Sequence, residues 1–330
     1  MEETSMSKLV VLLAGLGLAA AQVGTAWAQD AWPPARMTVV VSHDIGSSQN
    51  VTMRALGEVW QEKLGTQFVY ENRDGASGRV GYDYFLSQPK DGSVILSSNM
   101  GSASIMYAQQ KPEWQWREVL QPLGIFGVDP GAIFVKSDSE FQTLADVVAA
   151  AKERPMTLGL SFWASPENLQ IHQIMGETGA QFEVVPNDNS SEIMAQVLGG
   201  HVDVGYSKVG SVLRAGDGLR IIAIPLATNP VPNLTNNAPT ADEALGLETM
   251  GVASYRGVLV HKEWSDANPE HFQTLRDTFV EAIADPRFIE AMAEQGVDKE
   301  LIYDTPPDQI YSEILDRYWD AFERYGSIYD

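Results

Sequence analysis

The chain has 330 residues, a formal net charge of −22 at pH 7 and no cysteine. A surface this acidic repels the phosphates of nucleic acids and anionic lipids, so we expect no nucleic-acid partner. The absence of cysteine excludes thiol catalysis and thiolate-bound metals. Because the same field repels anions, a carboxylate site in this protein would need local hydrogen-bond donors and cations.

The first residues have the pattern of an export signal. Lys8 supplies a positive charge, and the apolar run after it is short for a membrane span. Ala26-Trp27-Ala28 then fits the small-x-small rule of signal peptidase. We therefore expect a signal peptide at residues 1–28, cleaved after Ala28, and a periplasmic mature protein; an uncleaved anchor or a buried helix is the alternative. Translation could begin at Met1 or Met6.

Beyond the signal, apolar runs alternate with helical patterns. Residues 37–41 form a β-branched run typical of a strand buried on both faces. Met53, Leu56, Trp60 and Leu64 recur at helical spacing, and Gly65 supplies a stop. Further strands are expected at 68–70, 94–96, 132–135, 157–160, 182–185, 202–206, 221–225 and 255–260, and further helices from Thr143, at 167–177, at 193–198 and twice near the end. This alternation predicts a parallel α/β sheet.

The size of the chain predicts two lobes. Residues 29–330 exceed the about 250–300 residues at which single cores stop growing. No Gly/Ser linker separates the halves, so we expect strands to cross between them. The expected division is 29–127 with 255–330 for lobe 1 and 128–254 for lobe 2. The last helix carries an apolar stripe that we expect in the core rather than in a ligand site, at Ile310, Ile314, Tyr318, Phe322 and Tyr325.

A glycine-rich stretch at 71–96 reads ENRDGASGRVGYDYFLSQPKDGSVIL. It resembles the ENRPGAGG and PDG signature of the Bug-type substrate-binding proteins of tripartite tricarboxylate transporters. Further matches to this family follow in the same order along the chain: VVVSHDIGSSQN at 39–50, VVPNDNSSEIMAQVLGGHVDVGYS at 184–207, APT at 238–240, the segment 285–296, and TP at 305–306. The resemblance covers nearly the whole mature chain.

The resemblance implies an α/β fold, a two-lobed type II periplasmic binding protein with the ligand cleft between the lobes. It implies a protein that is not an enzyme, holds no cofactor or metal, closes on a small di-, tri- or aromatic carboxylate by hinge motion, and delivers it to membrane transporter subunits. We expect it to act as a monomer. A periplasmic sensor subunit would share the fold. A serine hydrolase is the weaker alternative, because GLSFW at 159–163 lacks the last glycine of a GxSxG elbow. The five histidines show no metal-binding spacing.

The loop at 42–49 is the first candidate site. Ligands of open α/β sheets bind at the carboxyl ends of strands, and this loop joins the first strand to a helix start, which favours anions. Gly46 would let the backbone approach a ligand, and Ser47 and Ser48 offer hydroxyl donors. The alternative is a plain helix cap made by Ser48 or Asn50 with nothing bound.

Departures from the family pattern suggest what the ligand is. Ser42 and His43 replace Pro-Phe, and His43 is either structural or a carboxylate donor, best when protonated. Asn50 replaces an aspartate, which argues against an amino-acid ligand because no carboxylate is left there for an ammonium group. The acidic Glu71 and Asp74 make their stretch a poor anion site, so we expect it to shape the first lobe while specificity lies elsewhere.

Further candidates follow later strands. Ser98 and Asn99 match a second family loop, GSSST. Ser161 follows a strand of the second lobe, and the bulky Phe162 and Trp163 come next, where the family has small residues. These two rings could stack on an aromatic ligand or cap the cleft, and core packing is an equal alternative.

Two cations are candidate carboxylate partners. Asn189 and Ser190 lie in a segment that replaces the family's Tyr-Lys-Gly-Ser, and Lys208 is expected to compensate for the lost lysine. Arg256 is the second candidate; either cation could instead form a surface ion pair. From this role we expect Lys208→Ala to weaken ligand binding while the melting temperature of the empty protein barely moves.

Overall fold

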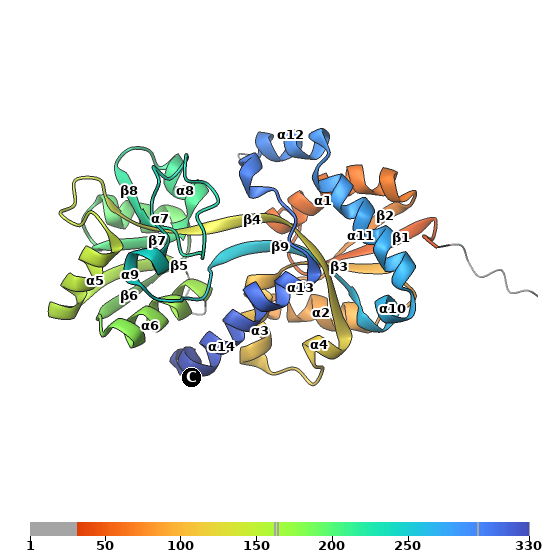
Figure 1. The fold of residues 1–330 in the computed structure, drawn as a ribbon, viewed down its shortest axis with the longest axis horizontal. Helices are drawn as coiled ribbons and strands as arrows, with labels where there is room; N and C mark the ends of the chain where they lie inside the picture. Colours follow the sequence, from red (N-terminus) through yellow and green to blue (C-terminus); the bar gives the residue numbers. More distant parts are fainter. Residues whose placement is uncertain (1–31, 162, 164, 296, 330) are drawn as a thin grey trace, which may run out of the picture.

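The computed structural model describes residues 32–329 apart from 162, 164 and 296 (Figure 1). The expected signal peptide at 1–28 and Phe162 lie outside the described residues. Within the part of the chain that is described, no helix is both long and apolar enough to cross a membrane.

The described strands form one mixed sheet with the order β2-β1-β3-β9-β4-β7-β5-β6, and β8 pairs with β4. Their bounds are β1 Arg36–Val41, β2 Gln67–Asn72, β3 Val94–Asn99, β4 Leu120–Lys136, β5 Met156–Ser161, β6 Phe182–Asn187, β7 Val204–Lys208, β8 Leu219–Ala223 and β9 Ala253–His261. The pairs β1–β2, β1–β3, β5–β6 and β5–β7 are parallel, as the alternation of strands and helices predicts.

Helices connect these strands. Their bounds are α1 Ser48–Leu64, α2 Arg79–Leu86, α3 Met100–Gln110, α4 Trp116–Val119, α5 Leu144–Glu153, α6 Pro166–Thr178, α7 Ser190–Leu198, α8 Val209–Arg214, α9 Ala241–Leu245, α10 Lys262–Ala267, α11 Pro269–Ile283, α12 Pro286–Glu294, α13 Pro307–Gln309 and α14 Asp316–Tyr325. The shorter helical segments are η1 Ala76–Gly78, η2 Lys299–Leu301, the π-helical η3 Ile310–Leu315 and η4 Gly326–Tyr329.

The helix ends follow from local chemistry. Ser47 caps α1 by accepting a hydrogen bond from the Asn50 N–H, so the cap is neither Ser48 nor Asn50, the two residues that the sequence offered for it. Gly65 ends α1 in the left-handed region, as predicted. Thr143 opens α5 with a capping box that includes Asp146.

Alternate strand residues enter two separate cores. Val39, Ile95 and Val258 pack with Trp60 of α1 and Phe279 of α11 on one face of the sheet. The opposite face, with neighbouring residues such as Val40 and Leu96, packs against α2 and α3. The expected stripe on the last helix belongs to this second core, since Ile310, Ile314 and Tyr318 are buried. Burial on both faces explains the continuous β-branched runs of the sequence.

Two strands cross between the lobes, as the absence of a linker suggests. Figure 1 shows β4 and β9 running side by side between the two groups of elements. The expected lobe boundaries meet in space, because Val128 of β4 pairs with Tyr255 of β9. β4 is far longer than the expected strand at 132–135, and its first half contains Pro122, Gly124 and Gly127, residues that usually weaken a strand signal.

The end of the chain contacts both lobes. α14 packs against α3 in the first lobe and α6 in the second, and η4 also contacts α6 (Figure 1). Tyr329 donates a hydrogen bond to the Ser165 carbonyl at 2.7 Å, and Tyr325 donates to Glu177 at 3.1 Å. The last residues therefore brace the start and end of α6.

Candidate ligand-binding cleft

A cleft of about 470 Å³ lies between the lobes, at the carboxyl ends of β1, β3, β5 and β7. From the first lobe and β9 it is lined by Ser42, His43, Asp44, Asp74, Gly75, Ser77, Gly78, Asn99, Ser102, Ile105, Met106, Gln109, Ala253 and Ser254. From the second lobe it is lined by Ser161, Ser165, Pro166, Glu167 and Lys208. Strand ends and helix starts converge here, which is where α/β sheets bind ligands.

A second cavity of about 650 Å³ lies at the opposite edge of the crossing strands. Its walls include Leu226, which follows β8, and Thr305. Thr305 forms a bridge to Ile125 of β4, on the edge of β4 that does not pair with β9. No carboxyl end of the parallel strands β1, β3 or β5 lines it. The cleft between the lobes is therefore the better ligand site, although it is the smaller of the two.

Neighbouring strands hold the first wall in place. The Arg73 N–H bonds to the Val41 carbonyl at 2.9 Å, and the Asn72 side chain donates to the His43 carbonyl at 2.8 Å. The chain after β1 and the chain after β2 are thus tied together. As a result Asp44 and Asp74 emerge at the same end of the cleft, and both side chains are exposed.

The start of α3 forms the middle of this wall. The Asn99 side chain caps the helix by accepting from the Gly101 N–H, and it also accepts from the Tyr255 N–H, each at 3.2 Å. Ser102 lies in the first turn and faces the cleft. First-turn N–H groups carry partial positive charge, so this helix start can hold an anion.

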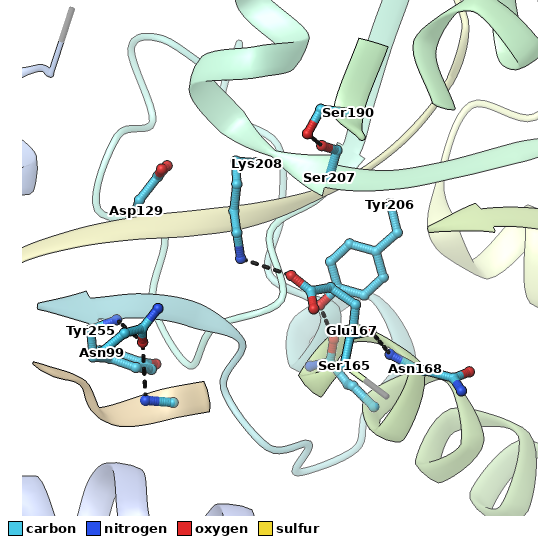
Figure 2. A network of polar contacts seen from close by, with 12 residues as sticks. Asn99, Asp129, Ser165, Glu167, Asn168, Ser190, Tyr206, Ser207, Lys208 and Tyr255 are labelled. Atoms are coloured by element: carbon cyan, nitrogen blue, oxygen red, sulfur yellow. Dashed lines mark hydrogen bonds and ion pairs between the residues drawn. The ribbon is translucent and has the colours of Figure 1, made fainter. Parts of the chain in front are cut away.

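A partly buried ion pair forms the second wall. Figure 2 shows Lys208 at the end of β7 pointing toward Glu167 in the first turn of α6, with an Nζ to Oε1 distance of 2.8 Å. Burial alone would raise the pKa of Glu167, but the Lys208 ammonium and the Ser165 hydroxyl hold it below its ordinary value. Glu167 is therefore ionised at neutral pH and neutralises Lys208.

Polar groups behind this pair are also satisfied. Burial, and then the charge of Glu167, raise the pKa of Tyr206 well above its ordinary value, so its hydroxyl stays protonated. That hydroxyl donates to Gln170, whose amide in turn donates to Thr249. This chain of hydrogen bonds links β7, α6 and the segment before β9 beside the ion pair.

His43 is neutral in this setting. Burial lowers its pKa, and the nearby Asp44 opposes that shift only in part. Its Nδ1 lies 3.3 Å from the Ser42 hydroxyl. A protonated imidazole that binds a carboxylate is thus disfavoured in the empty cleft, whereas a neutral His43 can still donate a hydrogen bond, so its contact with a ligand stays a prediction.

Five of the residues predicted for the site line the cleft: Ser42, His43, Asn99, Ser161 and Lys208. Near the start of α1, other predicted residues have local partners. Ser47 is the helix cap, and Asn50 is buried, where it donates to Asn72 and accepts from Arg54. Ser98 is buried against the Ser42 hydroxyl, and Gly46 occupies a left-handed turn. None of these lines the cleft, so their contact with a ligand stays a prediction.

Ser48 and Arg256 lie together outside the cleft. Arg256 is only 5% exposed, and it donates to the Ser48 hydroxyl at 2.7 Å and lies 3.7 Å from an Asp129 oxygen. Its position on β9, beside Asn99 of β3, sends the side chain toward the start of α1. A strand position alone did not reveal this direction.

The remaining predicted residues lie on the second lobe. Trp163 is 45% exposed, and its indole N–H donates to the Ile328 carbonyl, so it packs against the end of the chain rather than into the cleft. Asn189 caps α7, and Ser190 accepts a hydrogen bond from Ser207 at 2.8 Å.

Sequence reasoning missed the three carboxylates of the cleft. Asp44 lies inside the loop that was singled out, and Asp74 lies in the stretch expected only to shape the lobe. The stretch also lines the cleft, with Asp74, Gly75, Ser77 and Gly78, and the expectation that specificity lies elsewhere stays a prediction. Glu167 follows a Ser-Pro helix start, a signal that could have placed it in the first turn of α6. Among the described residues no group of three His, Asp or Glu side chains is arranged to hold a metal ion.

Sequence relatives resemble the chain over most of its length. A UPF0065 protein from the tcbD-tcbE intergenic region of Pseudomonas sp. (strain P51) is 27% identical over 291 residues, covering 87% of this chain and 85% of that protein. Protein BugT of Bordetella pertussis is 25% identical over 319 residues, covering 94% of each.

Solved structures share the fold. A TctC solute binding protein from Polaromonas superposes with a TM-score of 0.79 at 18% identity, covering 89% of this chain and all of that one. Two Rhodopseudomonas palustris proteins, one with adipate and MatC with bound malate, give TM-scores of 0.63 and 0.58 at 20% and 16% identity. They cover 90% of this chain each, and 98% and 100% of their own.

These likenesses confirm the two-lobed periplasmic binding protein fold that the motifs predicted. Residues 52–317 match the family described as the tripartite tricarboxylate transporter family receptor. The motifs at 71–96 and 184–207, which first suggested this relationship, both lie inside the matched region. The chain is therefore a solute-binding protein of the tripartite tricarboxylate transporter receptor family.

Proposed function

We propose that this protein captures a small organic carboxylate in the periplasm and delivers it, as a monomer, to membrane subunits of a tripartite tricarboxylate-type transporter. One observation carries the proposal: the cleft combines strand ends from both lobes with the starts of α3 and α6. Family membership and the relatives bound to adipate and malate support the ligand class.

Capture requires the lobes to close. We propose that residues 29–127 with 255–330 move against 128–254 by bending β4 and β9 near the Val128–Tyr255 pair. Closure would bring the loops after β1 and β2 toward Lys208 and Ser161. The ligand would then lose most of its contact with water, which strengthens each polar interaction in the cleft.

We propose binding without turnover. Ser42, beside His43 and Asp44, superficially resembles a Ser-His-Asp constellation, but its hydroxyl is buried and donates to Ser98 at 3.0 Å. A nucleophile would need its hydroxyl free and facing the cleft. The arrangement supports a hydrogen-bonding wall rather than a catalytic group.

The test is a thermal-shift screen of the mature protein against mono-, di- and tricarboxylates, with adipate and malate included, followed by calorimetry of the hits. A ligand at 100 times its Kd stabilises the folded state by about 2.7 kcal/mol, so a true ligand raises the melting temperature clearly. Incubating each hit with the protein should return it chemically unchanged.

The screen can fail in two informative ways. If no carboxylate raises the melting temperature, the ligand class is wrong. If a bound compound is converted to product at a rate that depends on protein concentration, the protein is an enzyme and the transport role falls.

A further inference from the structure

Arg256 lies where the two lobes are joined. It follows Tyr255, whose pairing with Val128 marks the proposed bending point of the crossing strands. The residue is only 5% exposed, and its side chain leaves β9 on the face of the sheet that packs against α1. Arg256 therefore sits between the crossing strands and the start of α1, without lining the cleft itself.

The guanidinium of Arg256 is incompletely paired. Its Nη2 donates to the Ser48 hydroxyl at 2.7 Å and lies 3.7 Å from an Asp129 carboxylate oxygen, which is too far for a hydrogen bond. Its Nη1 is buried and has no hydrogen-bond partner among the residues that the structure describes. A buried donor without an acceptor and a loosely paired buried charge both cost stability. Such a cost points to a role in function rather than in stability.

A second buried arginine provides the contrast. Arg276 is 9% exposed, and its two terminal nitrogens donate to the two carboxylate oxygens of Asp304. This bidentate geometry is the strong form of an arginine–carboxylate contact, and it joins α11 to the segment between η2 and α13. Neither partner lines the cleft. Arg276 is thus paired as a structural residue is expected to be, whereas Arg256 is not.

Two consecutive residues of β9 hold two helix starts of the first lobe. The Tyr255 N–H donates to the Asn99 side chain, which caps α3. The Arg256 guanidinium donates to Ser48, the first residue of α1. The loop before α1 lines the cleft with residues 42–44, and Asn99 lines it as well. A movement of β9 at the hinge is therefore passed to both helix starts beside the ligand.

We propose that Arg256 is a positioning residue for ligand binding. It does not touch the ligand, and it couples the bending of β4 and β9 to the loop before α1 through its contacts with Asp129 and Ser48. The loose contact with Asp129 lets the guanidinium adjust as the lobes move, which a bidentate pair would resist. The assignment rests on the proposed function, because it assumes that closure accompanies capture, and it names the residue that links the two.

The variant Arg256→Met tests the role. Calorimetry with succinate, malate, glutarate and adipate first identifies the acid that the unmodified protein binds most tightly, and that acid is the probe. Arg256→Met should bind it about tenfold more weakly, an effect of the size found for residues that couple two sites. The melting temperature of the empty variant should stay the same or rise, because methionine fills the space without a buried charge. A residue with only a structural role would instead lower the melting temperature.

Arg276→Met is the matched control. It makes the same substitution at a similarly buried arginine, but it leaves the Asp304 carboxylate without its partner. It should therefore lower the melting temperature and leave the affinity for the acid unchanged.

A second variant isolates the contact with α1. Ser48→Ala removes the acceptor and keeps the arginine, so it should weaken binding by part of the same factor. The double variant Ser48→Ala, Arg256→Met should bind no more weakly than Arg256→Met alone, because both changes break one linkage.

Hydrogen exchange of the empty protein tests the linkage without a ligand. Arg256→Met should speed the exchange of the backbone amides at 42–51, because the loop and the first turn of α1 lose their attachment to β9. Arg276→Met should leave the exchange of these amides unchanged.

The outcomes separate the role of Arg256 from the function of the protein. If one of the acids binds and Arg256→Met binds it as tightly as the unmodified protein does, the positioning role is overturned and the receptor function stands. An equal loss of affinity in Arg276→Met also overturns the role, because the effect then reflects a general loss of rigidity. If none of the four acids binds, the proposed function loses its first ligands and the exchange experiment decides. Unchanged exchange at 42–51 overturns the role, and faster exchange confined to Arg256→Met supports it.

Discussion

The two walls of the cleft treat charge in opposite ways. In the second lobe, Glu167 is buried and paired with Lys208, and it also accepts hydrogen bonds from Ser165 and from its own backbone N–H. In the first lobe, Asp44 and Asp74 are exposed and face the cleft without a cation. A buried charge must be neutralised within the protein, whereas an exposed charge is stabilised by water. The charges of the second wall are thus already paired in the empty protein, and the carboxylates of the first wall are not.

Removing Lys208 should give the largest effect. Lys208→Met leaves the Glu167 carboxylate buried without its partner, so we expect the free energy of unfolding at pH 7 to fall by about 3 kcal/mol. This revises the expectation from sequence that the empty protein would be nearly unaffected. Urea unfolding measures the change.

The matched control for this prediction is the double variant Lys208→Met, Glu167→Gln, which removes both charges. It should recover most of the lost stability, because no uncompensated charge remains. If Lys208→Met alone unfolds at the same urea concentration as the unmodified protein, the ion pair is not a structural part of the wall.

Acid should weaken the same wall more gradually. The pKa of Glu167 is held below its ordinary value of 4.5, so its ionised form stabilises the fold fully above that pH. This contribution is lost as the pH falls through the lower pKa of the folded protein. The stability advantage over the charge-free double variant should therefore shrink below pH 4.5, as measured by urea unfolding at a series of pH values. A constant difference across the series contradicts the assignment.

The end of the chain offers a smaller perturbation of the second wall. Tyr329→Phe removes the hydroxyl that donates to the Ser165 carbonyl, so we expect a loss of about 1 kcal/mol in stability together with weaker ligand binding. Tyr325→Phe is the matched control, because it removes a hydrogen bond to Glu177 at the other end of α6. Equal effects of both variants on ligand affinity would show that Tyr329 has no special link to the cleft.

The smallest change is expected in the first wall. Asp44→Asn with Asp74→Asn should alter the free energy of unfolding by less than about 0.5 kcal/mol, because exposed side chains without partners contribute little to stability. Thermal unfolding of the empty protein checks this. A large destabilisation would mean that these acids hold the loop, and the contrast between the two walls would disappear.

Much of the fold could be predicted from local sequence. The β-branched run of β1, the cap at Thr143 and the stop at Gly65 each have a local physical cause, and the structure confirms them. The first half of β4 was missed because Pro122 and Gly124 weaken its strand pattern, and its pairing with β9 depends on tertiary structure.

The site was harder to predict than the fold. Lys208 ends β7 and Arg256 lies within β9, both near the expected cleft. Lys208 faces the cleft, whereas Arg256 points toward the start of α1. The partner of Lys208 is 41 positions away in the sequence, so the ion pair depends on tertiary structure. Asp44 and Asp74 were not predicted as site residues because acidic side chains repel an anionic ligand. Their positions after β1 and β2 nevertheless lie in loops that line the cleft.

The position of β9 has a consequence for how this protein folds. β9 lies between β3 and β4, so the sheet of the first lobe lacks the strand that joins β3 to β4 until residues 253–261 are available. A fragment that ends before β9 would expose an open edge on β3, which invites aggregation. Contacts of such long range also form slowly. The sheet of the first lobe is thus completed only by the last quarter of the chain.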